Sequence, residues 1–194
     1  MTHELFPALT ATDWDAWHRS PAAEERVVNA ERCFAELAVF FSRTTPCREM
    51  VAVDLGCGTG AWTQLLVDWG ITHTTGLDFS TVALKKAASR PVSSTPRYDL
   101  WDATTDPLPA RNIDVITCRY LWEYLDPATE ERLLDLIRQS LKPVMGALYL
   151  SFRTATTTDP FQRGLTDERI DRLSEGWLRQ DRFTLGPSDG ALYL

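Results

Sequence analysis

Val51-Ala52-Val53-Asp54-Leu55-Gly56-Cys57-Gly58-Thr59-Gly60-Ala61-Trp62 stands out along the chain because an apolar, β-branched run leads directly into three glycines at every second position. The apolar run predicts a short buried strand, and the glycines predict a sharp turn. Apolar residues at three- and four-residue spacing then predict a helix over residues 61–69. The backbone N–H groups at the start of such a helix point toward any ligand held in the turn.

Two classes of cofactor compete for this turn. Gly56, Gly58 and Ala61 satisfy the dinucleotide-binding fingerprint G-x-G-x-x-G/A, in which the helix start holds a pyrophosphate. Asp54 argues against a pyrophosphate, because a carboxylate at the exit of the strand repels an anion and attracts an ammonium group. A glycine turn without any ligand is the third interpretation.

The pattern D-x-G-x-G-x-G followed by a helix resembles, position by position, the first motif of the class I S-adenosylmethionine (SAM) methyltransferases. The resemblance implies that Asp54, Gly56, Cys57, Gly58 and Gly60 bind SAM, and that S-adenosylhomocysteine (SAH) is the product. It also implies an α/β fold with a doubly wound, seven-stranded, mostly parallel sheet and an N-terminal helical lid. The ligand would lie over the C-terminal ends of the strands.

A second acid follows the glycine turn at the distance that a βαβ unit requires. Residues 72–77 form a β-rich run, and Asp78 comes about 20 residues after Gly56, at the predicted end of the second strand. A carboxylate there can accept hydrogen bonds from both ribose hydroxyls of an adenosine. The resemblance adds that Phe79 lines the adenine. Because NAD would use Asp78 in the same way, this acid does not separate the two cofactors.

Residues 98–101 and 113–118 are the predicted third and fourth strands. The resemblance implies that Asp102 and Ala103, which follow the third strand, contact the adenine amino group and ring. It places Cys118 and Arg119, at the end of the fourth strand, beside the methionine part of the cofactor. Arg119 is also a candidate for holding an acidic acceptor.

The segment after the fourth predicted strand reads Leu121-Trp122-Glu123-Tyr124-Leu125, where small-molecule methyltransferases often carry V-L-H-H-L. The absence of both histidines puts histidine-assisted deprotonation in doubt. Glu123 and Tyr124 are candidate replacements, although a surface acid and a packed aromatic ring explain them equally well. Methyl transfer from a sulfonium depends mainly on alignment of nucleophile, methyl and sulfur, and needs a base only for an acceptor that must lose a proton.

Residues 1–49 are predicted to form a helical cap. Residues 23–41 carry an apolar stripe typical of an amphipathic helix. The aromatic and polar segment before it either packs onto the core or, by the resemblance, forms a lid over the cofactor. As part of a lid, Trp17 would face the positive sulfonium. His18 is a candidate general base, although a lone histidine in a polar segment is more often simply exposed.

The remaining segments complete the expected fold. Asp126 and Pro127 predict the start of a helix whose apolar face runs over 131–141. A fifth strand over 147–152, a pocket rim over 154–163 and a helix over 166–180 are expected next. The last segment predicts a closing hairpin of 182–185 with 191–194 that is short or frayed. We therefore expect one domain over 1–194, with the cap over 1–49 and a Rossmann-like core over 50–194.

Composition narrows the classes of partner. The net charge is −7 and no Lys/Arg cluster is present, which argues against a nucleic-acid partner. The apolar runs are too short to span a membrane and no signal peptide is predicted, so cytoplasm is the default location. The four cysteines are scattered, which suggests neither a metal site nor a disulfide framework. A small-molecule acceptor and a monomer or homodimer are expected.

Two rival functions are weighed against SAM-dependent methyl transfer. An NAD-linked short-chain reductase needs a Tyr-x-x-x-Lys pair, and none of the lysines has such a tyrosine. A protein with the SAM fold that binds the cofactor without transferring methyl, such as a regulatory subunit or a repurposed cyclase, is not separated from an enzyme by the sequence. We favour methyl transfer to a small-molecule acceptor, driven mainly by proximity.

Overall fold

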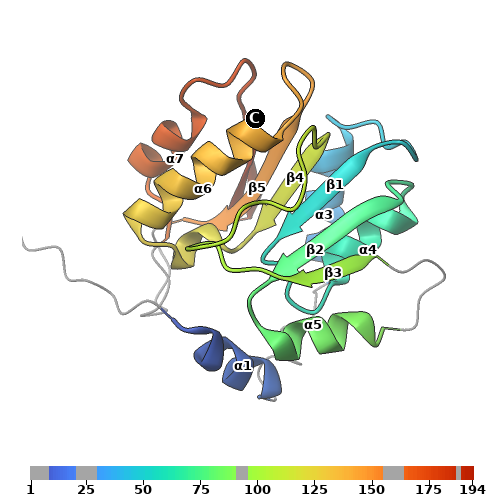
Figure 1. Cartoon of the computed structure of the whole chain (residues 1–194). Coiled ribbons are helices and arrows are strands. Elements are labelled where there is room, and N and C mark those ends of the chain that lie inside the picture. The colour runs from blue at the N-terminus through green and yellow to red at the C-terminus, as the bar shows by residue number, and fades with distance from the viewer. Residues whose placement is uncertain (1–8, 21–29, 91–95, 155–163, 187–188) are drawn as a thin grey trace, which may run out of the picture.

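A computed structural model of the chain describes residues 9–20, 30–90, 96–154, 164–186 and 189–194. Within these residues one sheet of seven strands has the order β3-β2-β1-β4-β5-β7-β6 (Figure 1). The strands are β1 (Val51–Leu55), β2 (His73–Asp78), β3 (Arg97–Leu100), β4 (Val115–Arg119), β5 (Ala147–Arg153), β6 (Asp181–Gly186) and β7 (Asp189–Tyr193). The first five strands pair in parallel, and β7 lies antiparallel between β5 and β6.

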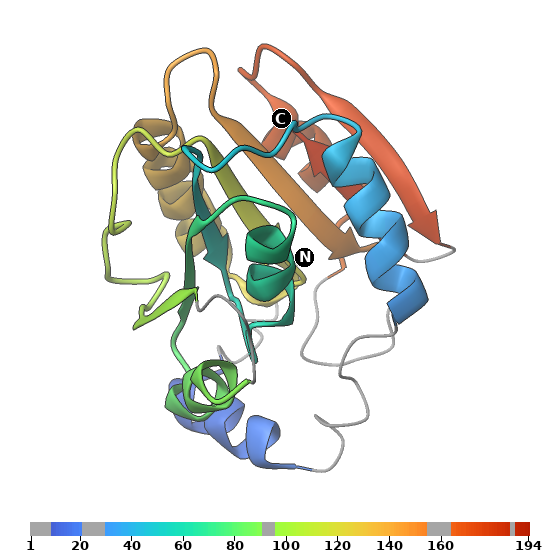
Figure 2. The same ribbon diagram turned by 90° about the vertical axis from the view of Figure 1, so that its right-hand side faces the viewer.

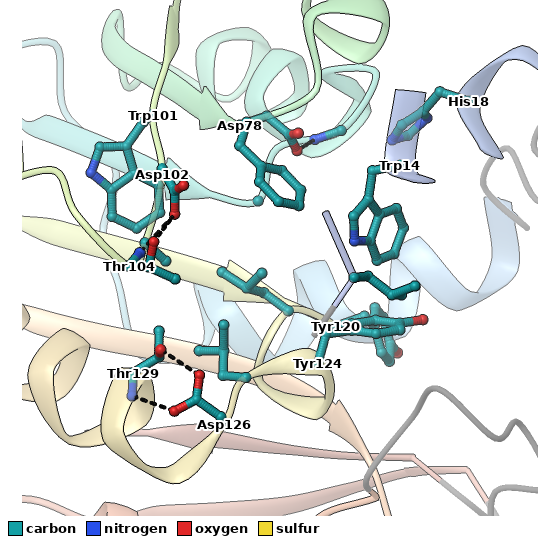
Figure 3. Close-up of a pocket in the computed structure, with 17 residues that line it drawn as sticks. Trp14, His18, Asp78, Trp101, Asp102, Thr104, Tyr120, Tyr124, Asp126 and Thr129 are labelled. Carbon is teal, nitrogen blue, oxygen red and sulfur yellow. Dashed lines mark hydrogen bonds between the residues drawn. The ribbon is translucent and has the colours of Figure 1, made fainter. Parts of the chain in front are cut away.

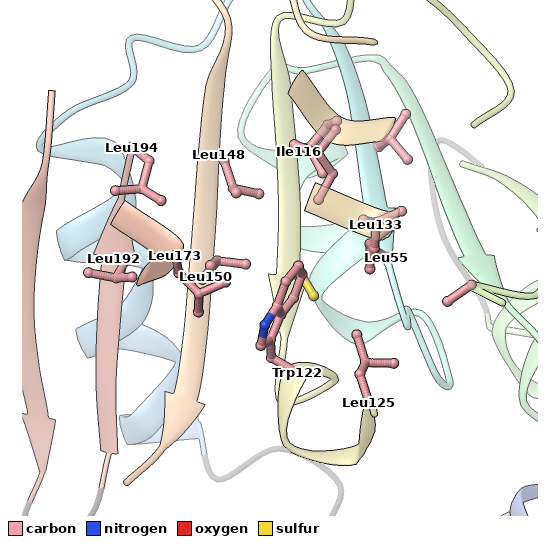
Figure 4. Close-up of a cluster of buried hydrophobic side chains, with 14 of the residues drawn as sticks. Leu55, Ile116, Trp122, Leu125, Leu133, Leu148, Leu150, Leu173, Leu192 and Leu194 are labelled. Atoms are coloured by element: carbon pink, nitrogen blue, oxygen red, sulfur yellow. The ribbon is translucent and has the colours of Figure 1, made fainter. Parts of the chain in front are cut away.

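Helices cover both faces of this sheet (Figures 1 and 2). The covering helices are α3 (Ala30–Phe41), α4 (Ala61–Asp68), α5 (Thr81–Ala88), α6 (Pro127–Ser140) and α7 (Asp167–Ser174). Helix α1 (Ala11–Arg19) and a short 3-10 turn η1 (Trp122–Tyr124) after β4 complete the described helices. Leu133 of α6 and Leu173 of α7 pack with Leu55, Leu148 and Leu192 of the strands on one face (Figure 4). The doubly wound α/β architecture expected from the sequence is therefore confirmed.

Helix α3 belongs to the layer on the other face. Its side chains Leu37 and Phe40 are buried with Trp62 of α4 and with Tyr149 and Tyr193 of the sheet. The part of the predicted helix before residue 30 lies outside the described residues. Because α3 packs on the sheet, it is not part of a separate cap. Of the predicted cap, the described part that stands apart from the sheet is α1, which lies beside α5 (Figure 1).

Two boundaries at the end of the chain differ from the prediction. Helix α7 ends at Ser174, because Glu175 is extended and Gly176 adopts a left-handed φ of 78°. The closing hairpin is not frayed. Leu194 and Leu148 exchange two backbone hydrogen bonds of 2.9 Å, and β7 is an interior strand of the sheet. Pairing on both sides holds this strand in place to its last residue.

Candidate active site

The glycine turn follows β1 and has a backbone that side chains would disturb. Gly56, Gly58 and Gly60 have φ angles of 66°, 53° and 75°, which glycine adopts far more easily than other residues. A Cβ atom on Gly60 would lie 2.3 Å from the hydroxyl oxygen of Tyr98. The requirement for glycine is thus both conformational and steric, and it brings bare backbone to the C-terminal end of β1.

Asp78 is the last residue of β2 and faces this turn. Its Oδ2 accepts a hydrogen bond from the Gly58 N–H, and its Oδ1 accepts one from the Ser80 N–H, both at 2.8 Å. Burial raises the pKa of the carboxyl, while these hydrogen bonds favour its charged form. The two bonds fix the orientation of the carboxylate at the edge of a cavity (Figure 3).

This cavity has a volume of about 220 Å³ and lies over the C-terminal ends of the parallel strands. Its wall combines helix α1, the glycine turn, the end of β2, and the segments that follow β3 and β4. The residues that line it are Leu9, Trp14, His18, Gly56, Gly58, Asp78, Phe79, Trp101, Asp102, Ala103, Thr104, Tyr120, Leu121, Tyr124, Leu125, Asp126 and Thr129. Eight predicted site residues thus come together: Gly56, Gly58, Asp78, Phe79, Asp102, Ala103, Tyr124 and His18.

Asp102 and Trp101 occupy the part of the wall that follows β3. Asp102 Oδ1 accepts hydrogen bonds from the backbone N–H and the hydroxyl of Thr104, at 2.8 and 2.7 Å (Figure 3). The indole N–H of Trp101 donates to the Pro107 carbonyl at 3.0 Å, and only 5% of the residue is exposed. Trp101 therefore both fills the core and contributes to the cavity wall.

Asp54 does not line the cavity, and its contact with the cofactor stays a prediction from the sequence. Its two carboxylate oxygens accept hydrogen bonds from the hydroxyls of Thr63 and Thr117 at 2.6 and 2.8 Å. The strand register pairs Asp54 with Gly76, two residues before Asp78. Asp54 therefore lies about 7 Å further than Asp78 from the edge of the sheet at which β2 ends. Burial raises the pKa of Asp54 to about 6.

Arg119 is likewise turned away from the cavity. Its Nε donates to Glu36 Oε2 at 2.5 Å, its Nη2 also contacts that oxygen, and the guanidinium lies 4.5 Å from the centroid of the Trp62 ring. The Glu36 carboxylate is fully buried in α3. This buried pairing occupies the guanidinium, and the expectation that Arg119 borders the cofactor or holds an acidic acceptor stays a prediction.

Three further predicted residues in or near the strands also lie outside the cavity wall. Cys57 and Cys118 are buried, and burial raises the pKa of both thiols well above its usual range. Cys118 packs in the core on the side of α6, and Gly60 faces Tyr98 rather than the cavity. None of these three residues lines the cavity, and their contact with a ligand stays a prediction from the sequence.

Glu123 is neither a surface acid nor a residue of the cavity wall. It is 1% exposed, and its Oε1 accepts a hydrogen bond from the Arg153 N–H at 2.6 Å, so the carboxyl points toward the end of β5. Burial raises the pKa of Glu123 to about 7. Its neighbour Tyr124 does line the cavity, and its ring meets that of Trp14 edge-on with centroids 4.8 Å apart.

Helix α1 presents a different tryptophan from the one expected. Trp14 and His18, one turn apart, line the cavity (Figure 3). Trp17 instead packs edge-on against both of these rings. His18 is buried rather than exposed. Burial and the positive charge of Lys86 lower the pKa of His18 to about 4, so it is neutral near pH 7 and a weak base.

Tyr120, which no sequence pattern singled out, lines the cavity directly after β4. Its φ of 52° is unusual for a bulky residue, and its hydroxyl donates to Glu36 Oε1 at 2.6 Å. No local pattern marks this position, because the anchor lies on a distant helix. Trp14 could have been predicted as a cavity residue from the sequence, because it lies in the same aromatic segment as Trp17 and differs from it only in the face of the helix that it occupies.

Comparisons with known proteins agree with this geometry. Residues 52–144, almost half of the chain, match the family model described as methyltransferase domain. No curated protein matches the chain.

Solved structures share the fold over nearly the whole chain. The structure of DhpI in complex with SAH has a TM-score of 0.72 at 16% identity, with 94% of this chain and 95% of that chain covered. A SAM-dependent methyltransferase from Anabaena variabilis has a TM-score of 0.71 at 18% identity, with 100% and 97% covered. The glycopeptide N-methyltransferase MtfA in complex with SAM has a TM-score of 0.66 at 18% identity, with 82% and 92% covered.

The matched model spans the glycine turn, Asp78, Asp102 and the segment after β4. The fold, a seven-stranded sheet that closes with an antiparallel hairpin, is shared with solved SAM-dependent methyltransferases. Over residues 52–144 the chain matches a methyltransferase domain.

Proposed function

We propose that this protein transfers the methyl group of SAM to a small-molecule acceptor. The observation that carries the proposal is the single cavity that joins the glycine turn, Asp78 and Asp102 to an aromatic wall of Trp14, Tyr120 and Tyr124. Its volume of about 220 Å³ lies just below the range of roughly 300–1,000 Å³ that is typical of ligand pockets.

The residues around Asp78 fit an adenosyl group. The Asp78 carboxylate accepts backbone hydrogen bonds from Gly58 and Ser80, and because a carboxylate offers about four acceptor sites, ribose hydroxyls can be accepted as well. Phe79 and Ala103 offer apolar contacts for the adenine, and Asp102 an acceptor for its amino group. Gly56 and Gly58 leave room for the methionine part to approach the backbone.

The aromatic wall suits the reacting end of the cofactor. The negative faces of aromatic rings attract a sulfonium cation, and the rings of Trp14 and Tyr124 are held edge-on against each other. SAM supplies an activated methyl group, which leaves sulfur as the acceptor nucleophile bonds to carbon, and neutral SAH results. The chain itself holds acceptor and donor in line and keeps water out, which can supply several kcal/mol.

Proton removal has a smaller part in this proposal. His18 is a weak base and Glu123 is outside the cavity, which leaves Tyr124 as the candidate among the predicted catalytic residues. We therefore propose proximity as the main source of catalysis, with acceptors whose nucleophile is already deprotonated reacting best.

The domain organisation also stays a proposal. We infer one domain over 1–194 in which α1 covers the site, with α3 assigned to the core layers rather than to a lid. Among the described residues, no helix combines the length and apolarity that a membrane crossing requires. A cytoplasmic location, the absence of a nucleic-acid partner and a monomeric or homodimeric state remain predictions from the sequence.

The proposal is tested with purified protein, SAM that carries an isotopically labelled methyl group, and a small-molecule extract of the organism that produces the protein. A labelled small molecule that forms with the wild type and not with Asp78→Ala supports methyl transfer. SAH binding without a labelled product from any acceptor would favour a regulatory protein. Capture of nicotinamide dinucleotides without SAH binding would contradict the whole assignment.

A further inference from the structure

Asp15 of α1 places its carboxylate at the N-terminus of another helix, α5. Its Oδ1 accepts hydrogen bonds from the Ser80 hydroxyl at 2.6 Å and from the Val82 N–H at 3.1 Å, and its Oδ2 accepts one from the Thr81 hydroxyl at 3.1 Å. The first N–H groups of a helix have no partner within it, and a negative charge there is favourable. Asp15 thus caps α5 from outside.

The capping residue of α5 itself links Asp15 to the site. The Ser80 side chain accepts a hydrogen bond from the Ala83 N–H and donates to Asp15, while the Ser80 N–H donates to Asp78 Oδ1 at 2.8 Å. Ser80 therefore joins the carboxylate that holds α1 to the carboxylate that we assign to the ribose.

A second contact holds the other end of α1. The Lys86 Nζ donates to the His18 carbonyl oxygen at 2.7 Å, near the C-terminus of α1 where carbonyl groups lack helical partners. Trp14 and His18 project from this same helix into the cavity (Figure 3). The position of α1 on α5 thus decides whether these two rings complete the wall.

We propose that Asp15 is a positioning residue that seats α1 over the cofactor cavity, so that the release of α1 and the release of the cofactor are coupled. The identity of the ligand as SAM or SAH rests on the proposed function, whereas the seating of α1 on α5 does not. The hydrogen bonds to Asp15 hold its pKa below the usual range, so the carboxylate is charged near neutral pH.

Hydrogen exchange on the ligand-free protein tests the seating directly. In Asp15→Ala the amides of residues 11–19 should exchange about tenfold faster than in the wild type, because the contacts to α5 are lost. Alanine is a better helix former than aspartate, so faster exchange would not reflect lower helix propensity. Asp15→Asn should be intermediate, since its amide oxygen can still accept the same hydrogen bonds.

The matched control is Arg19→Ala on the same helix. The Arg19 side chain is 62% exposed and pairs with Asp15 at 3.7 Å, so its removal deletes the ion pair within α1 and leaves the contacts to α5. Exchange in this variant should stay within about twofold of the wild type. An equal effect of Arg19→Ala and Asp15→Ala would overturn the inference.

The rate of SAH dissociation, measured by stopped-flow fluorescence, tests the coupling. Asp15→Ala should release SAH about tenfold faster than the wild type. Because Asp15 acts through Ser80, adding Ser80→Ala to Asp15→Ala should increase the release rate by a smaller factor than Ser80→Ala does in the wild type. Unchanged exchange and unchanged release in Asp15→Ala would overturn the inference. A wild type that binds no SAH would contradict the proposed function instead, and the exchange experiment would still decide the role of Asp15.

Discussion

Replacing Glu123 by glutamine should make the protein more stable at alkaline pH without abolishing methyl transfer. The carboxyl is 1% exposed, and its Oε1 accepts a hydrogen bond from the Arg153 N–H. Among the residues that the structure describes, its Oε2 has no hydrogen-bond partner. Burial raises its pKa from 4.5 to about 7, although the nearby Arg153 and Arg169 oppose this shift. The amide of glutamine has nearly the same shape and carries no charge.

The magnitude follows from the two pKa values. A difference of about 2.5 pKa units corresponds to about 3 kcal/mol, at about 1.4 kcal/mol for each unit. Between the two values the folded protein keeps a proton that the unfolded chain releases. The free energy of unfolding of the wild type therefore falls as pH rises through this window and levels off above it. Glu123→Gln lacks this dependence, so its advantage should approach about 3 kcal/mol near pH 8 and become small near pH 5.

Urea denaturation at both pH values measures the difference. Glu131→Gln, an exposed position on α6, is the matched control and should change stability by less than about 0.5 kcal/mol at either pH. Equal stability of Glu123→Gln and the wild type near pH 8 would refute the argument from burial. Loss of turnover with unchanged SAH affinity would instead identify Glu123 as the base that its position argues against.

Further predictions concern the cavity and its support. Asp78→Ala should weaken SAM binding more than about tenfold in calorimetry, and unchanged affinity would exclude the ribose role. Trp14→Ala should raise the KM for SAM in a steady-state assay more than Trp17→Ala, because only the first ring lines the cavity; equal effects would contradict the placement. Glu36→Ala should cost about 3–5 kcal/mol in thermal unfolding by removing the buried carboxylate that pairs with Arg119 and accepts the Tyr120 hydroxyl, and a double variant with Arg119→Ala that recovers none of this would contradict the buried pair.

The parts of the fold that local patterns specify could be predicted from the sequence. The β-branched run from Val51, the glycines after it and the acid at position 78 act through near neighbours, so strand, turn and strand end were predicted within a residue or two. Asp126 and Pro127 likewise predicted the start of α6. The predicted boundaries are wrong where a distant contact or a single glycine decides the end of an element, as Gly176 does after α7.

The site was predicted less completely because its geometry depends on register and on long-range pairs. Asp54 and Asp78 look alike in the sequence, yet the pairing of Asp54 with Gly76 leaves only Asp78 at the strand end. Arg119 follows β4 as expected, but Glu36 on α3 draws it to the opposite side. No pattern within either segment contains this partner.

Tyr120 shows how the fold prepares the reacting end of the cavity. A left-handed conformation at a bulky residue costs about 1–3 kcal/mol and persists only where the surroundings enforce it. Here the Tyr120 N–H bonds to the Ser151 carbonyl at 2.8 Å and its hydroxyl to the buried Glu36. The next residue, Leu121, packs where a Cβ on Gly56 would come within 3.2 Å of it. The wall between the glycine turn and the aromatic end is thus fixed from three sides, as a reaction that depends on alignment requires.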